Sequence, residues 1–181
     1  MEFSRLYHSI QLLLLMNPER RAKYIKKHNI FKECGDNCMF MFRKIPIYPQ
    51  YIKCHNNVRI ASNVTMCTHD AIHRMFNNIK SEKVEFKERI GCIELLDNVF
   101  IGTNSVVLYD TKIGPNVIVA ANSLVNKDIA NGVYGGVPAK YICSINEYKA
   151  KIRNRQKRIN ENVGDTEEEK NWNFFKKEHY L

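Results

Sequence analysis

The segment IELLDNVFIGTNSVVLYDTKIGPNVIVAANSLVNKDI, residues 93–129, repeats one pattern every six residues. Its aliphatic positions lie six apart, at Leu95, Ile101, Val107, Ile113, Val119 and Val125. Two positions before each of them is a small or β-branched residue, at Ile93, Val99, Ser105, Thr111, Val117 and Ser123. Polar pairs such as Thr103-Asn104 fill most of the gaps. Neither a helix, which buries every third or fourth residue, nor a half-buried strand, which alternates, has this period.

A period of six fits short strands that are joined by tight corners. Each strand points its aliphatic residue inward, the small residue fills the interior near the next corner, and Asn, Asp or Gly takes the corner conformation. Stacked turns of this kind bury one continuous hydrophobic column. A β-sandwich is the alternative, but sandwich strands rarely keep one spacing over six units. The repeat therefore predicts an all-β solenoid, a parallel β-helix.

Degraded copies of the repeat precede residue 93. They occupy residues 34–38, 54–58, 60–64 and 66–68. The aromatic stretch 40–46 interrupts the register. Its aromatic side chains could line a pocket, but we expect Phe40 and Phe42 to fill the core, because such side chains are usually buried. The solenoid is therefore placed at residues 31–143.

Helical segments are predicted on both sides of the solenoid. In residues 1–30, Leu6, Ile10 and Leu13 have helical spacing, and Asn17-Pro18 divides the segment into two helices. The second of these helices is rich in Lys and Arg, which we interpret as a solvated face. Residues 144–181 form a C-terminal helical extension that begins with a basic helix.

The hexad register breaks again at residues 69–91, a polar excursion that is too long for a corner. Long excursions from a rigid scaffold often carry function. Of the six histidines, His69 alone opens this loop, and a neutral imidazole with a pKa of about 6.5 suits a general base at neutral pH. An ordinary surface histidine is the alternative. Asp70 is assigned a supporting role, and His73 and Arg74 are placed on the acceptor side.

Length and charge restrict the class of protein. A chain of 181 residues with 44% hydrophobic residues suits one packed domain. Its net charge of +9 favours anionic ligands. The basic helix has only Tyr148 beside it for base stacking, so no nucleic acid is expected. A peripheral membrane contact through residues 10–16 and the basic helix stays open. We expect a cytoplasmic protein, because no signal peptide is evident.

The cysteines do not form a metal-binding pattern. Cys34 and Cys38 lie four apart, and the other four of the six are scattered, so we expect reduced thiols. A zinc site at Cys34 and Cys38 would lack a second ligand pair. His69 and His73 could share a helix face, but a convincing third histidine is missing. No metal is expected.

The hexads, the loop that opens with His69 and the closing motif GGVPAKYI at 135–142 together resemble the hexapeptide-repeat acyltransferases. The likeness is strongest to the maltose, galactoside and xenobiotic O-acetyltransferase branch. The stretch NPERRAKYIKKHNIF at 17–31 is similar to the helical preface of the maltose and galactoside enzymes. The resemblance covers residues 17–143.

This resemblance implies a left-handed parallel β-helix, a homotrimer, an active site between neighbouring subunits and acetyl-coenzyme A as the acyl donor. The family's catalytic histidine falls on His69. Its coenzyme A contacts fall on Thr103, Ala121, Asn126, Lys127 and Lys140, where the lysines would meet phosphates, although a solvated lysine is the alternative. An early-coil asparagine of the family has no counterpart at residues 39–42, so an apolar wall is expected there.

Together these features predict transfer of an acetyl group from acetyl-coenzyme A to a hydroxyl of a saccharide or saccharide-like acceptor. His69 would act as the general base while both substrates are bound together, without a covalent intermediate. N-acetylation of an amino sugar is one alternative. A non-catalytic trimeric scaffold that binds anionic partners is another.

Overall fold

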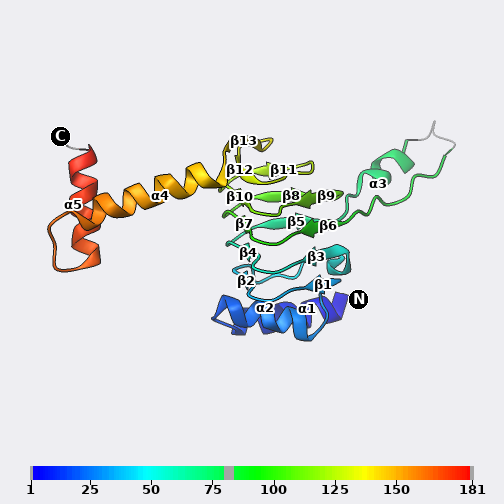
Figure 1. Ribbon diagram of the computed structural model, residues 1–181. Helices are drawn as coiled ribbons and strands as arrows, with labels where there is room; N and C mark the ends of the chain where they lie inside the picture. Colours follow the sequence, from blue (N-terminus) through cyan, green and yellow to red (C-terminus); the bar gives the residue numbers. More distant parts are fainter. Residues whose placement is uncertain (1, 80–83, 180–181) are drawn as a thin grey trace. The chain divides into compact units, whose positions relative to one another are not determined.

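The computed structural model describes residues 2–79 and 84–179 (Figure 1), so residues 80–83 of the predicted excursion lie outside the described residues. The chain forms two compact units, Met1–Ile142 and Cys143–Leu181. The first unit contains the hexad repeats, and the second contains the C-terminal helices. Each is described by itself below.

The first unit is built from three sheets of short strands. The first sheet contains β1 (Glu33–Cys34), β3 (Ile52–Cys54), β6 (Ile93–Leu95) and β9 (Thr111–Ile113). The second contains β2 (Met39–Phe40), β4 (Arg59–Ile60), β7 (Val99–Ile101), β10 (Val117–Val119), β12 (Gly132–Gly135) and β13 (Lys140–Cys143). The third contains β5 (Thr65–Cys67), β8 (Val106–Leu108) and β11 (Leu124–Val125).

From β1 to β12, consecutive strands belong to different sheets, because β3, β4 and β5 lie one in each sheet before β6 returns to the first. The neighbouring strands of the stack from β1 to β12 are paired in parallel. The chain therefore winds around three faces, which confirms the predicted parallel β-helix. Its left-handed winding stays a prediction.

The interior column is the one that the repeat predicts. Both six-residue series are buried, including the small polar residues Ser105, Thr111 and Ser123 beside the corners. Phe40 and Phe42 stack on each other inside the first coil, with ring centroids 5.3 Å apart, so their predicted core role is confirmed. Burial of each Ile, Leu or Val side chain contributes about 1.5–3 kcal/mol, so the column dominates the stability of this unit.

Asparagines form a ladder along the corner between the first and second sheets. Asn37, Asn57, Asn98 and Asn116 all have left-handed backbone conformations, with φ between 54° and 60°. Each side-chain amide donates to the carbonyl oxygen of the next asparagine, at 3.2, 2.8 and 3.0 Å along the series. Asparagine tolerates this conformation better than most residues, which explains its choice at the corner.

Replacing Asn57 with alanine is expected to lower the free energy of unfolding by about 2 kcal/mol, because a left-handed alanine is strained and ladder hydrogen bonds are lost. Glycine at the same position adopts the conformation without strain and should cost less. Urea unfolding at one protein concentration measures both. Equal losses for the two variants would show that backbone strain does not matter at this corner.

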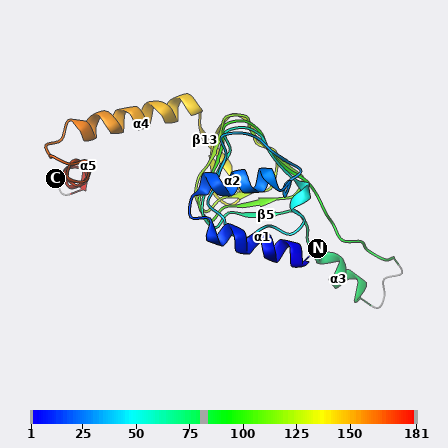
Figure 2. The same ribbon diagram turned by 90° about the horizontal axis from the view of Figure 1, so that it is seen from below.

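The two N-terminal helices that the sequence predicts lie across one end of the β-helix (Figure 2). They are α1 (Glu2–Leu14) and α2 (Pro18–Lys27). Asn17 caps α2, because its side-chain oxygen accepts the Arg20 amide at 2.9 Å. Leu12 and Ile25 belong to the same hydrophobic cluster as the strands. These helices therefore close the core of the first coil.

The basic side chains of α2 do not all face solvent. Arg21 is only 1% exposed, so the interpretation of this helix's basic residues as a solvated face is wrong for Arg21. Its Nε donates to the Phe40 carbonyl and its Nη1 to the Leu15 carbonyl, both at 2.7 Å. Burial lowers the pKa of the guanidinium. Arg21 thus joins the chain at the end of α1 to strand β2, where a cation also suits the negative end of a helix dipole.

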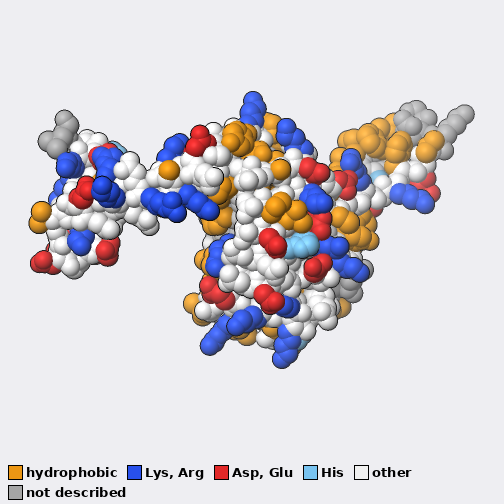
Figure 3. Space-filling model, viewed as in Figure 1, with side chains coloured by type: hydrophobic (Ala, Val, Ile, Leu, Met, Phe, Trp, Pro, Cys, Tyr) orange, Lys and Arg blue, Asp and Glu red, His pale blue; other side chains and the backbone are white. Residues whose placement is uncertain are grey.

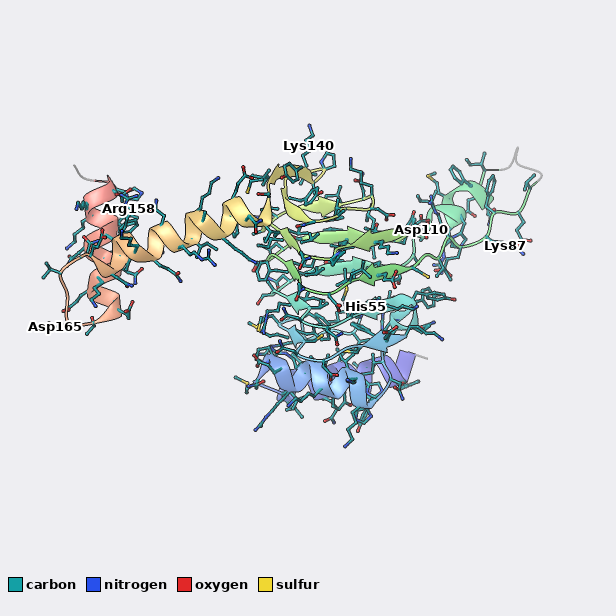
Figure 4. The ribbon with its side chains drawn as sticks, viewed as in Figure 1. His55, Lys87, Asp110, Lys140, Arg158 and Asp165 are labelled. Carbon is teal, nitrogen blue, oxygen red and sulfur yellow. The ribbon has the colours of Figure 1, made fainter. Side chains whose placement is uncertain are left out.

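Charges alternate on the outer face of the first sheet. Glu33, Lys53, Glu94 and Lys112 are successive neighbours across its strands. Figure 3 shows acidic and basic side chains interspersed on this face, and Figure 4 labels His55 there. The Nε2 atom of His55 lies 3.1 Å from Glu94 Oε1, a contact that lowers the pKa of Glu94. The outer face of the first sheet is therefore suited to exposure to solvent.

The remaining elements of the first unit are short. Helix η1 (Pro49–Tyr51) precedes β3, and α3 (Ile72–Asn77) lies in the excursion.

The helices of the second unit are α4 (Ile145–Asn160) and α5 (Glu167–His179), and α4 begins with a capping box between Ser144 and Glu147. Arg158 pairs with Glu178 and lies over the Phe174 ring, which holds these two helices together. Among the described residues, no helix combines the length and apolar character that a membrane span requires.

Candidate active site

His69 lies at the base of the excursion between β5 and β6. Its backbone forms an antiparallel bridge with Ile90, and the Gly91 amide donates to the Thr68 carbonyl at 2.9 Å. The Asp70 amide donates to the Arg89 carbonyl at 3.1 Å. The excursion therefore leaves and rejoins the β-helix as two paired arms, which fix the backbone of His69.

Thr68 and Tyr48 position His69, and the sequence does not indicate either residue. Thr68 is completely buried, and its Oγ1 donates to the Ile47 carbonyl at 2.5 Å. The Tyr48 ring packs edge-to-face on the imidazole of His69, with centroids 5.2 Å apart, and its hydroxyl donates to Glu88 Oε2 at 3.0 Å. These contacts join the excursion to the irregular loop of the preceding coil, so only the folded chain reveals them.

The imidazole of His69 lines a pocket of about 530 Å³. Its Nδ1 is buried, and no hydrogen-bond partner for it exists among the described residues. The other lining residues come from α1, from the loop after β2 and from the segment around β5: Arg5, Phe42, Arg43, Lys44, Ile45, Pro46, Ile47, Asn63, Val64, Thr65, Met66 and Cys67. Because Nδ1 is shielded from solvent, a proton exchanged with a bound ligand would pass through the other ring nitrogen, Nε2.

The Asp70 carboxylate contacts groups other than His69. Its Oδ2 accepts the Tyr109 hydroxyl at 2.5 Å, and its Oδ1 accepts the Ile72 amide at 3.0 Å. The Tyr109 hydrogen bond and then the Ile72 amide hold the pKa of Asp70 below its ordinary value. Asp70 therefore anchors α3 to the neighbouring coil, which is a positioning role. His73 and Arg74 both belong to α3, and Nδ1 of His73 is also buried without a partner in the described chain.

The predicted coenzyme A contacts lie at separate places in the chain. Thr103 and Ala121 are exposed on the edge between the second and third sheets, where the Asn122 amide donates to the Thr103 carbonyl at 2.9 Å. Asn126 and Lys127 follow β11 on the edge from which the excursion leaves. Lys140 begins β13 and is exposed (Figure 4). Thr103 and Ala121 therefore lie on a different edge of the β-helix from His69.

Gly102 determines how closely the coils approach near Thr103. A Cβ atom at Gly102 would lie 2.5 Å from the backbone nitrogen of Ala121 in the next coil. Only glycine fits without a shift of the backbone. The adjacent corners of Thr103 and Ala121 therefore pack closely against each other.

No metal-binding group stands out in the part of the chain that the structure describes. There, no cluster of three or more His, Cys, Asp or Glu side chains is arranged to hold a metal ion. Cys34 and Cys38, like the other cysteines, are free thiols.

Comparison with known proteins identifies the family. Residues 93–127 match the family model described as bacterial transferase hexapeptide, six repeats. CapG of Staphylococcus aureus is 34% identical over 77% of this chain and 81% of its own length. A galactoside O-acetyltransferase of Lactococcus lactis is 27% identical over 78% of this chain and 76% of its length. The Bacillus subtilis protein YvoF is 29% identical over 66% of this chain, and the match spans only 64% of YvoF.

A solved structure agrees with the fold. The maltose O-acetyltransferase of Clostridium difficile superposes with a TM-score of 0.53, at 23% identity, over 78% of this chain and 86% of that one. The repeats, the parallel three-sided winding and the relatives lead to one conclusion. The chain belongs to the hexapeptide-repeat acetyltransferase family.

Proposed function

We propose that this protein transfers an acetyl group from acetyl-coenzyme A to a hydroxyl of a saccharide or saccharide-like acceptor. The observation that carries the proposal is the placement of His69 on the wall of a pocket of about 530 Å³, at the fixed base of the excursion. The similarity to a galactoside O-acetyltransferase supports a saccharide as the acceptor.

His69 acts as the general base in this scheme. It takes the proton of the acceptor hydroxyl while the oxygen attacks the thioester carbon, and a tetrahedral intermediate forms. The C–S bond then breaks, the acetyl group stays on the acceptor oxygen, and the proton passes from His69 to the leaving sulfur. Both substrates are bound at once, so no covalent acyl-enzyme is needed. Hydrogen-bond donors stabilise the oxyanion.

Thr103, Ala121, Asn126, Lys127 and Lys140 bind the coenzyme in this proposal. Thr103 and Ala121 lie across the third sheet from the edge that carries His69, so a neighbouring subunit would complete the site. The lysines meet the phosphates. Small residues allow the pantetheine arm to lie against the packed corners beside Gly102.

A homotrimer with left-handed coils is the assembly we propose. Phe100 and Ile118 lie side by side on the outer face of the second sheet, and Val106 and Leu124 do so on the third. These apolar faces contrast with the charged ladder of the first sheet, and exposed apolar surface of this kind commonly marks a subunit interface. His73 and Arg74 of the excursion lie on the acceptor side of the cleft in this arrangement.

An acceptor panel tests this proposal. Thiol release from acetyl-coenzyme A should occur with at least one galactoside or related saccharide, and calorimetry should detect coenzyme A binding. Lability of the acetylated product to hydroxylamine distinguishes an ester from the amide that an amino sugar would yield. Absence of both turnover and coenzyme A binding would reject the enzyme and favour the trimeric scaffold that binds anionic partners.

A further inference from the structure

The pocket beside His69 is lined by positive charge. Its charged lining residues are Arg5 from α1 and Arg43 and Lys44 from the loop after β2. No aspartate or glutamate is among its lining residues within the described chain. Of the stretch 39–42, for which the sequence predicts an apolar wall, Phe42 borders this pocket.

These cations are not neutralised by carboxylates of the described chain. None of the ion pairs found among the described residues includes Arg5, Arg43 or Lys44. Arg43 is held in place, because its Nη1 donates to the Leu13 carbonyl at 3.0 Å. Unpaired cations around a concave surface raise the local concentration of anions and form charge-assisted hydrogen bonds with them.

We propose that this pocket binds the carboxylate or phosphate of an acidic saccharide, so that the acceptor is an anionic sugar. The inference rests on the proposed function and specifies its substrate class. The rest of the lining fits a sugar: Asn63 and Thr65 offer polar groups for hydroxyls, and the exposed Ile47 offers apolar surface for a ring face. A volume of about 530 Å³ lies within the range of small-molecule sites.

The phosphates of the coenzyme are the other source of such an anion. The lysines assigned to them, Lys127 and Lys140, lie after β11 and at the start of β13, in the last coils. The pocket lies beside β5, two strands away from β11 in the third sheet, or roughly 10 Å at the usual strand spacing. Within one chain the two lysines therefore lie outside the pocket, and the KM for acetyl-coenzyme A distinguishes the two sources of the anion.

The positive pocket also bears on the choice between hydroxyl and amine. An amino sugar can attack the thioester only as its neutral amine, because the ammonium form has no lone pair, and the ammonium form is also repelled by Arg5 and Lys44. A hydroxyl acceptor with an acidic substituent meets no such repulsion. The pocket consequently favours O-acetylation of an acidic sugar over N-acetylation of a free amino sugar.

The test compares galactose 1-phosphate and galacturonate with methyl galactoside. At least one acidic sugar should bind, by calorimetry, and should react with a kcat/KM about tenfold or more above that of the neutral sugar. Lys44→Gln and Arg5→Gln should each raise the KM and Kd of that acidic sugar about tenfold, the effect expected for one charge-assisted contact. The KM for acetyl-coenzyme A should not change. Lys27→Gln, an exposed lysine of α2 outside the pocket, is the matched control.

The outcomes separate this inference from the proposed function. Equal use of neutral and acidic sugars would overturn the anionic acceptor and leave acetyl transfer intact. A raised KM for acetyl-coenzyme A in Lys44→Gln, with unchanged sugar binding, would assign the cations to the coenzyme instead. Absence of calorimetric binding of both acidic sugars would also overturn the inference, whether or not any acceptor reacts.

Discussion

Replacing His69 with glutamine is expected to lower kcat at least a hundredfold, because the acceptor hydroxyl then loses its general base. Glutamine keeps a polar side chain of similar reach but cannot take up a proton at neutral pH. Its neighbours Thr68 and Tyr48 hold the site through contacts that do not require the imidazole to be charged. Binding of coenzyme A, measured by calorimetry, should therefore change little.

His55→Gln is the control for this experiment. His55 lies on the outer face of the first sheet beside Glu94, so its replacement should leave kcat within about twofold of the wild type. Circular dichroism and the oligomeric mass of both variants show whether the fold is kept. A His69→Gln enzyme that keeps a tenth or more of the wild-type kcat would exclude His69 as the base.

Replacing Arg21 with methionine is expected to lower the free energy of unfolding by about 3 kcal/mol. Methionine fills much of the space of the aliphatic stem but leaves the carbonyls of Leu15 and Phe40 without their donor. Each hydrogen bond from a charged donor contributes roughly 1.5–3 kcal/mol, and burial of the unpaired carbonyls adds a penalty. Urea unfolding at fixed protein concentration measures the loss.

Arg20→Met is the matched control, because Arg20 is the exposed neighbour in the same helix. Its expected effect is within about 0.5 kcal/mol. Similar losses of unfolding free energy for the two variants would mean that methionine destabilises helix α2 on either face. The hydrogen bonds of the Arg21 guanidinium would then not explain the loss. A large loss at Arg21 alone would show that its guanidinium joins the helical preface to the first coil.

The repeat predicts most of the β-helix, because each hexad places an aliphatic and a small residue on the inner face. Those positions need no long-range information. Arg21 could not be predicted in this way. A basic residue in an amphipathic helix usually faces water, and its carbonyl partners come from β2 and from the chain after α1, which only the fold brings together.

The site is predictable to a smaller extent. The break in the register locates His69 at the start of the excursion, where the structure places it beside a pocket. The positioning roles of Thr68 and Tyr48 could not be predicted from the sequence. Their contacts to Ile47 and Glu88 join residues that are far apart in the chain and that follow no repeat. The role of Asp70 could not be predicted from the sequence either. Its position next to His69 suggests catalysis, whereas its carboxylate contacts Tyr109 and the start of α3.

The paired arms of the excursion have a consequence for how such proteins diversify. Strand β6 resumes the stack directly above β3, as though only a corner separated β5 from β6. The inserted segment is therefore a cassette whose ends are fixed by the bridge between His69 and Ile90. Length and sequence between those ends can vary without shifting a single hexad, so new acceptors can be acquired while the scaffold and its histidine stay in place.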